Sequence, residues 1–293
     1  MGYHSLMNSA EPSVPEVIPY YDEATFTFTY LVIDPSSGRA AIIDPVLDYD
    51  LASRRIGTHS AERVLGAVAE RGLAVDWILE THAHADHLTA AEFLKRRLAG
   101  APRVGIGAGI QQVQTTFKEK LSLEPDFPTD GRQFDRLFQK GDRVALGALT
   151  IAVLDTPGHT PDSVSYLVGD AVFVGDTLFA PYYGTARCDF PGGDARQLYA
   201  SMQKLLALPA TTRIFLCHDY PPEGHAPQYQ STPRAQREQN IHLKDGIDEA
   251  SFVAMRRARD ATLKAPRLLE ASLRVNVRAG RLEDPHVTEE TLS

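Results

Sequence analysis

The segment of residues 81–87 constrains this chain more than any other, because it brings four metal-binding side chains within six positions. It reads T-H-A-H-A-D-H, and the residues between the ligand types are alanines, which are too small to crowd an ion. The apolar run W-I-L directly before it is typical of a buried strand that ends in a loop. Side chains alternate along extended chain, so His82, His84 and Asp86 start on one face and can converge, while His87 needs the turn. The segment therefore predicts a metal site.

Three further ligand candidates each follow a predicted strand. His159 lies in T-P-G-H-T, Asp176 ends V-F-V-G-D, and His218 ends I-F-L-C-H. A lone His or Asp at such a place is usually structural, but side chains projected from several strand ends converge on one edge of a sheet, where a cleft can hold an ion. Together with residues 81–87, they strengthen the prediction of a metal centre.

The remaining pattern predicts an α/β protein. Residues 25–33 alternate like a strand, a P-S-S-G turn follows, and residues 39–44 return as a second strand. Helices are expected at 61–71, at 88–98 and after the capping residue Asp194 up to Pro209. Further strands are expected at 76–80, 104–107, 143–146, 149–154, 163–168, 171–174 and 213–217. Residues 115–138 are read either as an excursion that borders a pocket or as simple cover, and the chain beyond Tyr220 as mostly helical.

Composition excludes several classes of protein. The chain has 293 residues with 43% hydrophobic and 23% charged, which is ordinary for a globular protein, and no apolar run is long enough to cross a bilayer. The first twenty residues lack the features of a secretory signal, so a cytoplasmic protein without membrane contact is expected. Two cysteines, Cys188 and Cys217, cannot form a disulfide framework and are read as buried thiols.

Charge is unevenly distributed along the chain. The formal net charge of -8 argues against a nucleic-acid partner. Residues 234–281 nevertheless carry eleven Lys or Arg against six Asp or Glu. This local excess is explained by solvated helix faces, by a site for an anionic small molecule or by a subunit contact.

The ligand candidates, in this order and on this strand pattern, resemble the metallo-β-lactamase superfamily. The resemblance covers about residues 25–220 and implies an αβ/βα sandwich of two mixed sheets, with flanking helices and the metal at one edge. The corresponding division is a catalytic domain at 20–225 and a mainly helical C-terminal extension at 226–293 packed on it. The scaffold alone does not determine the chemistry, because it carries hydrolases, nucleases and oxygenases.

Within that superfamily, two segments resemble the persulfide dioxygenases. They are D-T-L-F-A-P-Y-Y-G-T-A-R-C-D-F from Asp176 onward and C-H-D-Y at 217–220, and N-V-R-A-G at 276–280 is similar to longer bacterial members. The resemblance implies one Fe(II) per chain and the oxidation of glutathione persulfide with O2 to sulfite and glutathione, in sulfide detoxification. By position, the iron ligands are His82, His159 and Asp176. The side chains that orient or balance the site, or hold a second metal, are His84, Asp86, His87 and His218.

Two imidazoles and one carboxylate form a facial triad that leaves positions open on Fe(II), as an oxygenase requires. Arg187 matches an arginine in the loop of this group beside the metal, where a guanidinium can hold a substrate carboxylate or stabilise developing anionic oxygen; the other reading is an ion pair with Asp189. Tyr220 either lines the substrate pocket or packs in the interior.

Other functions remain open on the same residues. All seven positions of a two-metal site are filled, as in the glyoxalase II thiolesterases, where two Zn, Fe or Mn ions bridged by Asp176 activate water to attack a glutathione thioester. The least favoured alternative is a sensor of metal or sulfur species without catalysis. A homodimer is the expected assembly, because it is the commonest outcome for such proteins.

Overall fold

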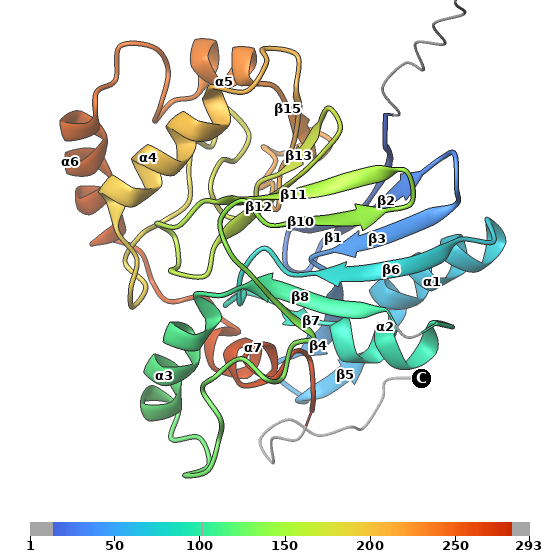
Figure 1. Cartoon of the computed structure of the whole chain (residues 1–293). Helices are drawn as coiled ribbons and strands as arrows, with labels where there is room; N and C mark the ends of the chain where they lie inside the picture. Colours follow the sequence, from blue (N-terminus) through green and yellow to red (C-terminus); the bar gives the residue numbers. More distant parts are fainter. Residues whose placement is uncertain (1–13, 101, 283–293) are drawn as a thin grey trace, which may run out of the picture.

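In the computed structural model, which describes residues 14–100 and 102–282, two mixed sheets pack face to face and helices cover both outer faces (Figure 1). This is the predicted αβ/βα sandwich. No helix in the described ranges is both long and apolar enough to cross a membrane. The segment searched for a secretory signal lies mostly outside the described residues, as do the last eleven residues of the predicted C-terminal extension.

The first sheet is antiparallel at one edge and parallel at the other. Its strands, in spatial order, are β1 (Glu16–Asp22), β2 (Thr27–Asp34), β3 (Arg39–Ile43), β6 (Ala74–Leu79), β8 (Arg103–Gly107) and β9 (Arg136–Phe138). The strands from β3 onward pair in parallel. A small antiparallel sheet, which the sequence did not predict, contains β5 (Arg55–Gly57), β4 (Val46–Asp50) and β7 (Leu88–Thr89).

The second sheet is antiparallel except for one pair, β13 with β14. Its strands, in spatial order, are β10 (Arg143–Leu146), β11 (Leu149–Asp155), β12 (Val164–Val168), β13 (Ala171–Phe173), β14 (Arg213–Phe215) and β15 (Gln230–Ser231). The helices are α1 (His59–Glu70), α2 (Ala91–Arg97), α3 (Ile110–Lys120), α4 (Ala195–Leu206), α5 (Pro233–Gln239), α6 (Glu249–Asp260) and α7 (Leu269–Asn276).

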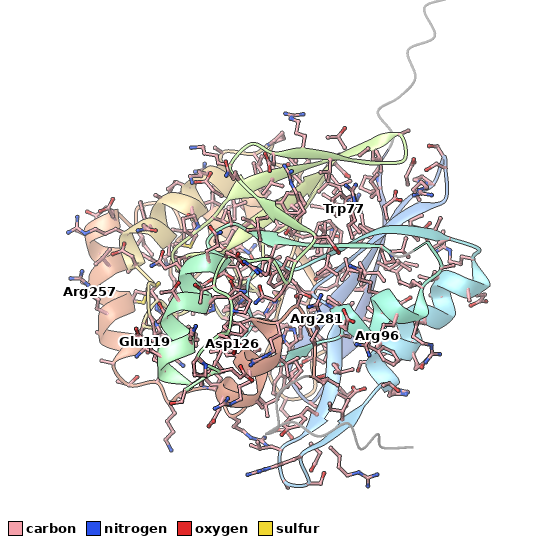
Figure 2. All side chains as sticks on the ribbon, turned by 60° about the horizontal axis from the view of Figure 1, so that its bottom comes forward. Trp77, Arg96, Glu119, Asp126, Arg257 and Arg281 are labelled. Carbon is pink, nitrogen blue, oxygen red and sulfur yellow. The ribbon has the colours of Figure 1, made fainter. Side chains whose placement is uncertain are left out.

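Alternation along the central strands produces the layers. In β2, Tyr30 and Val32 face the second sheet, whereas Leu31 and Ile33 face the helices on the other side. Both faces of this strand are therefore apolar, as expected for a strand covered on both sides. Trp77 of β6 is 1% exposed and lies between the two sheets (Figure 2).

Helix α4 begins where the sequence predicted. The side chain of Asp194 accepts a hydrogen bond from the backbone N–H of Gln197 at 2.8 Å, which satisfies one of the free donors at the start of the helix. The apolar face of α4, which includes Leu198 and Met202, packs on the outer side of the second sheet together with α6. The prediction of a capped helix before Pro209 is confirmed.

The chain beyond residue 225 is mainly helical but is interwoven with both sheets. Strand β15 pairs with β14 at the edge of the second sheet. Helix α7 and the residues after it bury Leu273, Val275, Val277 and Ala279 in the core on the outer face of the first sheet. Its division from residues 20–225 as a separate extension stays a prediction.

Two local expectations differ from the structure, and a third, which had two readings, is narrowed to one. Strand β1 was not predicted in the proline-rich start; it is an edge strand, where Pro19 is tolerated because its missing N–H faces away from the ladder. The helix expected at 88–98 begins only at Ala91, because residues 88–89 pair with β4. In residues 115–138, Phe117, Phe127 and Phe134 are buried in the core, so this segment acts as cover.

Candidate metal centre

The predicted ligands meet at one edge of the sandwich, where several strands end. Residues 81–87 follow β6, His159 follows β11, Asp176 follows β13 and His218 follows β14. The two sheets are joined at this edge, because the N–H of Phe28 in β2 donates to the carbonyl oxygen of Cys217 at 2.7 Å. The strand-end placement expected from the sequence is therefore what the structure shows.

Two glycines allow the chain to turn toward this edge. Gly175 has φ of +54°, and a Cβ atom on it would lie 2.6 Å from Oγ1 of Thr81. Gly158 has φ of +141°, and a Cβ atom there would lie 2.3 Å from the backbone nitrogen of Leu198. A side chain at Gly175 would have to displace that of Thr81, and one at Gly158 would have to displace the backbone of α4 at Leu198.

One set of candidate ligands consists of His82, His159 and Asp176, which we call the first set. One ligand atom from each residue lies within 4.8 Å of the other two. Nε2 of His159 is 3.5 Å from Oδ2 of Asp176, and all three side chains are at most 12% exposed. The three donors come from separate strand ends and form a two-imidazole, one-carboxylate group.

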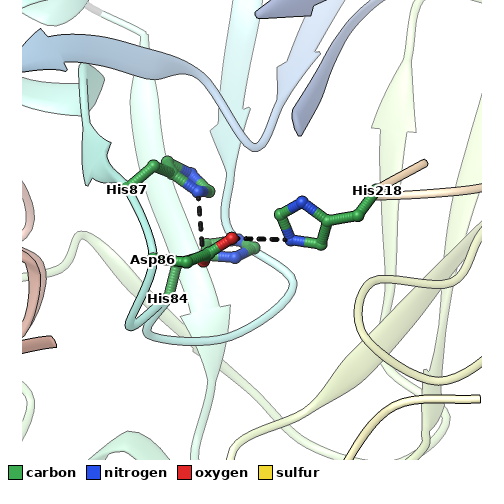
Figure 3. A group of neighbouring side chains, drawn as sticks. All are labelled: His84, Asp86, His87 and His218. Carbon is green, nitrogen blue, oxygen red and sulfur yellow. Dashed lines mark ion pairs between the residues drawn. The ribbon is translucent and has the colours of Figure 1, made fainter. Parts of the chain in front are cut away.

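A second set contains His84, Asp86, His87 and His218, again with one ligand atom from each within 4.8 Å of the others (Figure 3). Oδ1 of Asp86 lies 3.5 Å from Nδ1 of His87, and Oδ2 lies 3.3 Å from Nε2 of His218. The same Nε2 atom lies 3.2 Å from Oδ1 of Asp176, so His218 connects the second set to the first.

The donor atoms fit a metal ion. Nδ1 of His84 and Nε2 of His87 are buried and have no hydrogen-bond partner within the described part of the chain. Buried polar atoms are normally paired, so unpaired imidazole nitrogens that face other donors are what a metal site requires. Imidazole with carboxylate suits Fe(II), Zn(II) and Mn(II).

The tautomers of the first-set imidazoles follow from their other contacts. Oγ1 of Thr81 donates to Oδ2 of Asp44 at 2.9 Å and lies 3.1 Å from Nδ1 of His82. Because the hydroxyl proton is used on Asp44, Nδ1 of His82 is the donor and its Nε2 is left unprotonated. In the same way, Nδ1–H of His159 donates to the carbonyl oxygen of Arg187 at 2.7 Å. Both imidazoles thus have Nε2 free as a ligand atom.

Burial and neighbouring charges shift the pKa values of the site residues in different directions. Burial holds the pKa of His82 well below its usual range. Burial alone would raise the pKa of Asp176, but His218, His159 and His82 outweigh it and hold that pKa well below its usual range. Burial likewise disfavours the charged form of His218, yet Asp86 and Asp176 outweigh it and raise its pKa to about 10. The carboxylates therefore hold a positive charge between the two sets.

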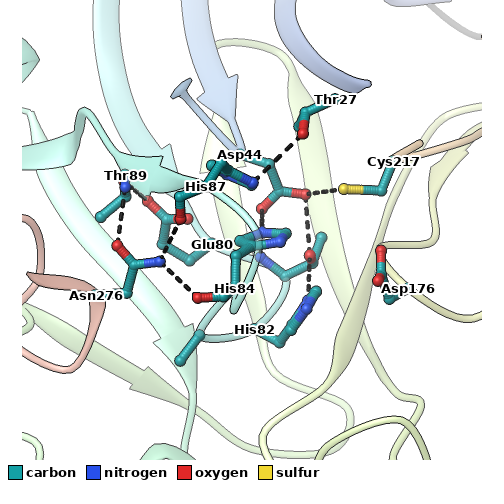
Figure 4. A network of polar contacts seen from close by, with 12 residues as sticks. Thr27, Asp44, Glu80, His82, His84, His87, Thr89, Asp176, Cys217 and Asn276 are labelled. Carbon is teal, nitrogen blue, oxygen red and sulfur yellow. Dashed lines mark hydrogen bonds and ion pairs between the residues drawn. The ribbon is translucent and has the colours of Figure 1, made fainter. Parts of the chain in front are cut away.

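Two residues that the sequence reading did not select support the ligand loop (Figure 4). Asp44, directly after β3, has φ of +49°, accepts the N–H of Thr81 at 2.7 Å and lies 3.1 Å from Nε2 of His84. Oγ1 of Thr27 lies 3.4 Å from Nδ1 of His87 and 3.2 Å from Nδ1 of His218. Asp44 had a signal in the sequence, because it ends a strand as Asp176 does.

A cavity of about 560 Å³ lies beside the first set. Near the metal candidates its lining includes Asp86, His159 and Asp176. Its other wall comes from α6 and the segment between α6 and α7, and this wall includes Arg256, Arg259, Leu263, Lys264, Pro266, Arg267 and Leu268. Four basic residues of this part of the chain therefore line the same cavity as the candidate ligands: Arg256, Arg259, Lys264 and Arg267.

Arg187 and Tyr220 both line this cavity. Nε and Nη2 of Arg187 donate to Asp189 at 2.6 Å each, and Nη1 donates to the carbonyl oxygen of Lys264 at 2.7 Å. The ion pair with Asp189 is therefore present, and three of the five N–H groups of the guanidinium are engaged. The ring of Tyr220 is half-buried, 4.6 Å from the ring of Tyr183.

Both cysteines are free and buried, in agreement with the reading as buried thiols. Cys217 nevertheless lies beside the ligands, since its thiol donates to Oδ2 of Asp44 at 3.6 Å. Burial, and then the charge of Asp44, raise the pKa of this thiol well above its usual range. A thiol kept neutral in this way is a poor metal ligand and a poor nucleophile.

Comparison with known proteins places this geometry in a family. Residues 23–218 match the family model of the Metallo-beta-lactamase superfamily. A probable metallo-hydrolase of Burkholderia pseudomallei is 51% identical over 91% of this chain and 93% of its own. Glyoxylase B2 of Dictyostelium discoideum is 47% identical over 91% of each chain. The mitochondrial persulfide dioxygenase ETHE1 of Homo sapiens is 30% identical over 89% of this chain and 87% of its own.

A solved structure agrees in fold. The crystal structure of ETHE1 from Myxococcus xanthus superposes with a TM-score of 0.71 at 30% sequence identity, and the match covers 91% of this chain and all of the other. Because residues 1–225 make up less than 91% of the chain, the match includes part of the chain beyond residue 225.

Proposed function

Because this chain belongs to the metallo-β-lactamase superfamily, whose members are metal-dependent enzymes, we propose that it is a persulfide dioxygenase. The substrate is glutathione persulfide, which O2 oxidises to sulfite and glutathione at a single Fe(II) held by His82, His159 and Asp176. This assignment would place the protein in sulfide detoxification. Its similarity to human persulfide dioxygenase and to ETHE1 of Myxococcus xanthus supports the proposal.

The observation that carries the proposal is the way the ligand candidates divide. His82, His159 and Asp176 group together, whereas His84 groups with Asp86, His87 and His218 and contacts Asp44. The first set then has two imidazoles and one carboxylate, which is the ligand set of non-haem iron oxygenases. Four protein ligands around one ion, as in the second set, would leave fewer open positions.

The protein holds the proposed ligands in a suitable orientation without a metal. Thr81 and the carbonyl oxygen of Arg187 orient the two imidazoles with Nε2 free. Asp176 supplies one negative charge to offset the ion. When bound, Fe(II) would supply the redox chemistry that couples dioxygen to the persulfide sulfur.

The cavity wall suits an anionic thiol carrier. Arg259, Lys264 and Arg267 line the cavity with exposed side chains, in a protein whose formal net charge is -8. Glutathione carries two carboxylates, so these cations would draw it to the cavity and orient it. Of the three explanations for the excess of Lys and Arg in residues 234–281, we therefore propose a site for an anionic small molecule.

Arg187 and Tyr220 are proposed as substrate contacts. The ion pair with Asp189 and the bond to the carbonyl oxygen of Lys264 hold the guanidinium of Arg187 at the cavity wall. Its two remaining N–H groups can donate to a substrate carboxylate or to developing anionic oxygen. Tyr220 offers an aromatic surface beside Tyr183 for the apolar part of the substrate.

The test combines metal analysis with oxygen uptake. Purified protein reconstituted with Fe(II) under anaerobic conditions is expected to hold about one iron per chain and to consume O2 only when glutathione persulfide is added. Sulfite should appear in step with the oxygen consumed. Iron-loaded protein that consumes no oxygen with persulfide would contradict the proposal.

The second candidate is a glyoxalase II-like hydrolase with two metal ions. The second set of four ligands favours it, because it can hold an ion of its own next to Asp176, and so does the 47% identity to Glyoxylase B2. Two metals per chain, and hydrolysis of a glutathione thioester without oxygen, would establish this alternative. Stoichiometric binding of persulfide without turnover of either substrate would indicate the third reading, a sensor.

A further inference from the structure

Asn276, the last residue of α7, reaches the ligand loop from the far end of the chain (Figure 4). Its Nδ2 donates to the carbonyl oxygen of His84 at 2.8 Å and to that of His87 at 2.9 Å. Its Oδ1 accepts the backbone N–H of Thr89 at 2.8 Å. The side chain is only 3% exposed, so these three bonds are shielded from water.

Among short side chains, only a carboxamide can make these three hydrogen bonds at once. The two carbonyl oxygens need donors, and the N–H of Thr89 needs an acceptor, all from one short side chain. A carboxylate has no donor, and a hydroxyl has only one. Without Asn276, two buried carbonyls and one buried N–H of the loop would lose their partners, and unpaired polar groups in the interior are costly.

Asn276 is itself held in place by the residues next to it in the chain. Val275 and Val277, on either side of Asn276, are fully buried in the core of the first sheet. The carbonyl oxygen of Val277 accepts a hydrogen bond from Nε2 of Gln114 in α3 at 2.9 Å. The position of residues 84–89, which contain three members of the second set, therefore depends on the packing of the core through Asn276.

We infer that Asn276 is a positioning residue of the metal centre: by holding the carbonyl oxygens of His84 and His87 it fixes the loop that also carries His82 of the first set, and it makes metal binding depend on α7. The inference rests on the proposed metal site but not on the proposed reaction. It assigns the last helix a role in metal binding in addition to any contact with substrate.

The experiment titrates metal-free protein with Co²⁺, whose visible absorption reports the geometry of its ligands. Asn276→Ala is expected to bind Co²⁺ about 10–100-fold more weakly than the unchanged chain, with an altered visible spectrum, as is typical when the partners of metal ligands are removed. Asn240→Ala is the matched control, because Asn240 is also a fully buried asparagine whose Nδ2 donates to a backbone carbonyl, that of Gly184, and whose Oδ1 accepts a backbone N–H, that of His242. It should lose thermal stability but keep its Co²⁺ affinity and spectrum.

Three outcomes separate the possible failures. If the unchanged chain binds no metal, the proposed function fails first. If it binds Co²⁺ and Asn276→Ala binds equally well with the same spectrum, the inference is overturned. If Asn240→Ala loses affinity as severely as Asn276→Ala, the effect belongs to general stability, and the inference is also overturned.

A measurement on the unchanged chain covers the case in which Asn276→Ala does not fold. Coupling is reciprocal, so metal binding should slow hydrogen exchange at the N–H of Thr89 and along Leu269–Asn276. Several-fold slower exchange in these two segments upon addition of Co²⁺ is expected. Exchange rates in α7 that do not change with metal would refute the coupling.

Discussion

The Nδ1–H of His159 donates to the backbone carbonyl oxygen of Arg187 at 2.7 Å, while its Nε2 faces Asp176 at 3.5 Å. The bond decides which nitrogen carries the proton before any metal arrives. It also connects the first set to the loop that carries Arg187, so a change in that loop alters the orientation of a proposed ligand.

Replacement of the first set should remove the metal. His82→Ala, His159→Ala and Asp176→Ala are each expected to lower the bound iron at least 10-fold, because each deletes one of the three proposed ligands. Metal analysis after gel filtration measures this directly, and persulfide-dependent oxygen uptake should fall with it. His218→Ala is the comparison, and it should retain iron, since His218 belongs to the second set. Equal loss of metal from His218→Ala would favour a dinuclear site instead.

Neutralisation of the cavity wall should weaken substrate binding. Arg259→Gln, Lys264→Gln and Arg267→Gln are each expected to raise the Michaelis constant for glutathione persulfide about 3–10-fold with little change in kcat, because the cations act on the carrier and not on the reacting sulfur. Initial rates at two ionic strengths check this, since added salt should shrink the differences. Arg257→Gln is the control, because Arg257 is exposed on α6 and does not line the cavity (Figure 2). Unchanged constants in all three variants would refute an electrostatic role.

The buried pair of Arg256 and Asp260 should be important for stability. Arg256 is 1% exposed, its Nε donates to Asp260 at 2.8 Å, and Asp260 also accepts the N–H of Cys188 at 2.8 Å. Asp260→Ala leaves a buried charge without its carboxylate, so we expect the free energy of unfolding to fall by about 3–5 kcal/mol in urea titrations. The double variant Arg256→Met/Asp260→Leu should lose less. A loss below about 1 kcal/mol in Asp260→Ala would contradict this account.

His242 should make stability depend on pH. Burial, and then Arg256 and Arg259, lower its pKa from 6.5 to about 4. Between these values the unfolded chain binds a proton that the folded protein excludes, so this residue makes the free energy of unfolding fall as the pH falls from about 6.5 to about 4. Urea midpoints across this range should decline less steeply for His242→Gln than for the unchanged chain. Parallel curves would show that His242 has an ordinary pKa.

The sequence was sufficient for the features that depend on local spacing. T-H-A-H-A-D-H and the strand-end residues His159, Asp176 and His218 identify the metal centre, because each follows an apolar run whose length and composition are typical of a strand. The cap at Asp194 was predictable for the same reason, since it involves residues only three positions apart.

Features that depend on distant contacts could not be predicted. Nothing in the sequence near Asn276 shows that it bonds to backbone atoms 187 to 192 positions earlier. Nor does the pattern show that Thr27 lies between two imidazoles, because a threonine at the start of a strand is ordinary. Strand β1 was missed for a different reason, since Pro19 suppresses the signal of a strand that survives only at an edge.

The hydrogen bond between Thr89 and Asn276 joins two residues that the ribosome adds at widely separated times. The two residues are 187 positions apart, so a ribosome that adds about 5–20 residues per second exposes the ligand loop roughly 10–40 s before it makes the residue that clamps it. During that interval the nascent chain carries His82, His84 and His87 on a loop whose carbonyls have no partner from α7. The ligand loop consequently gains its last hydrogen-bond partner only when synthesis reaches residue 276.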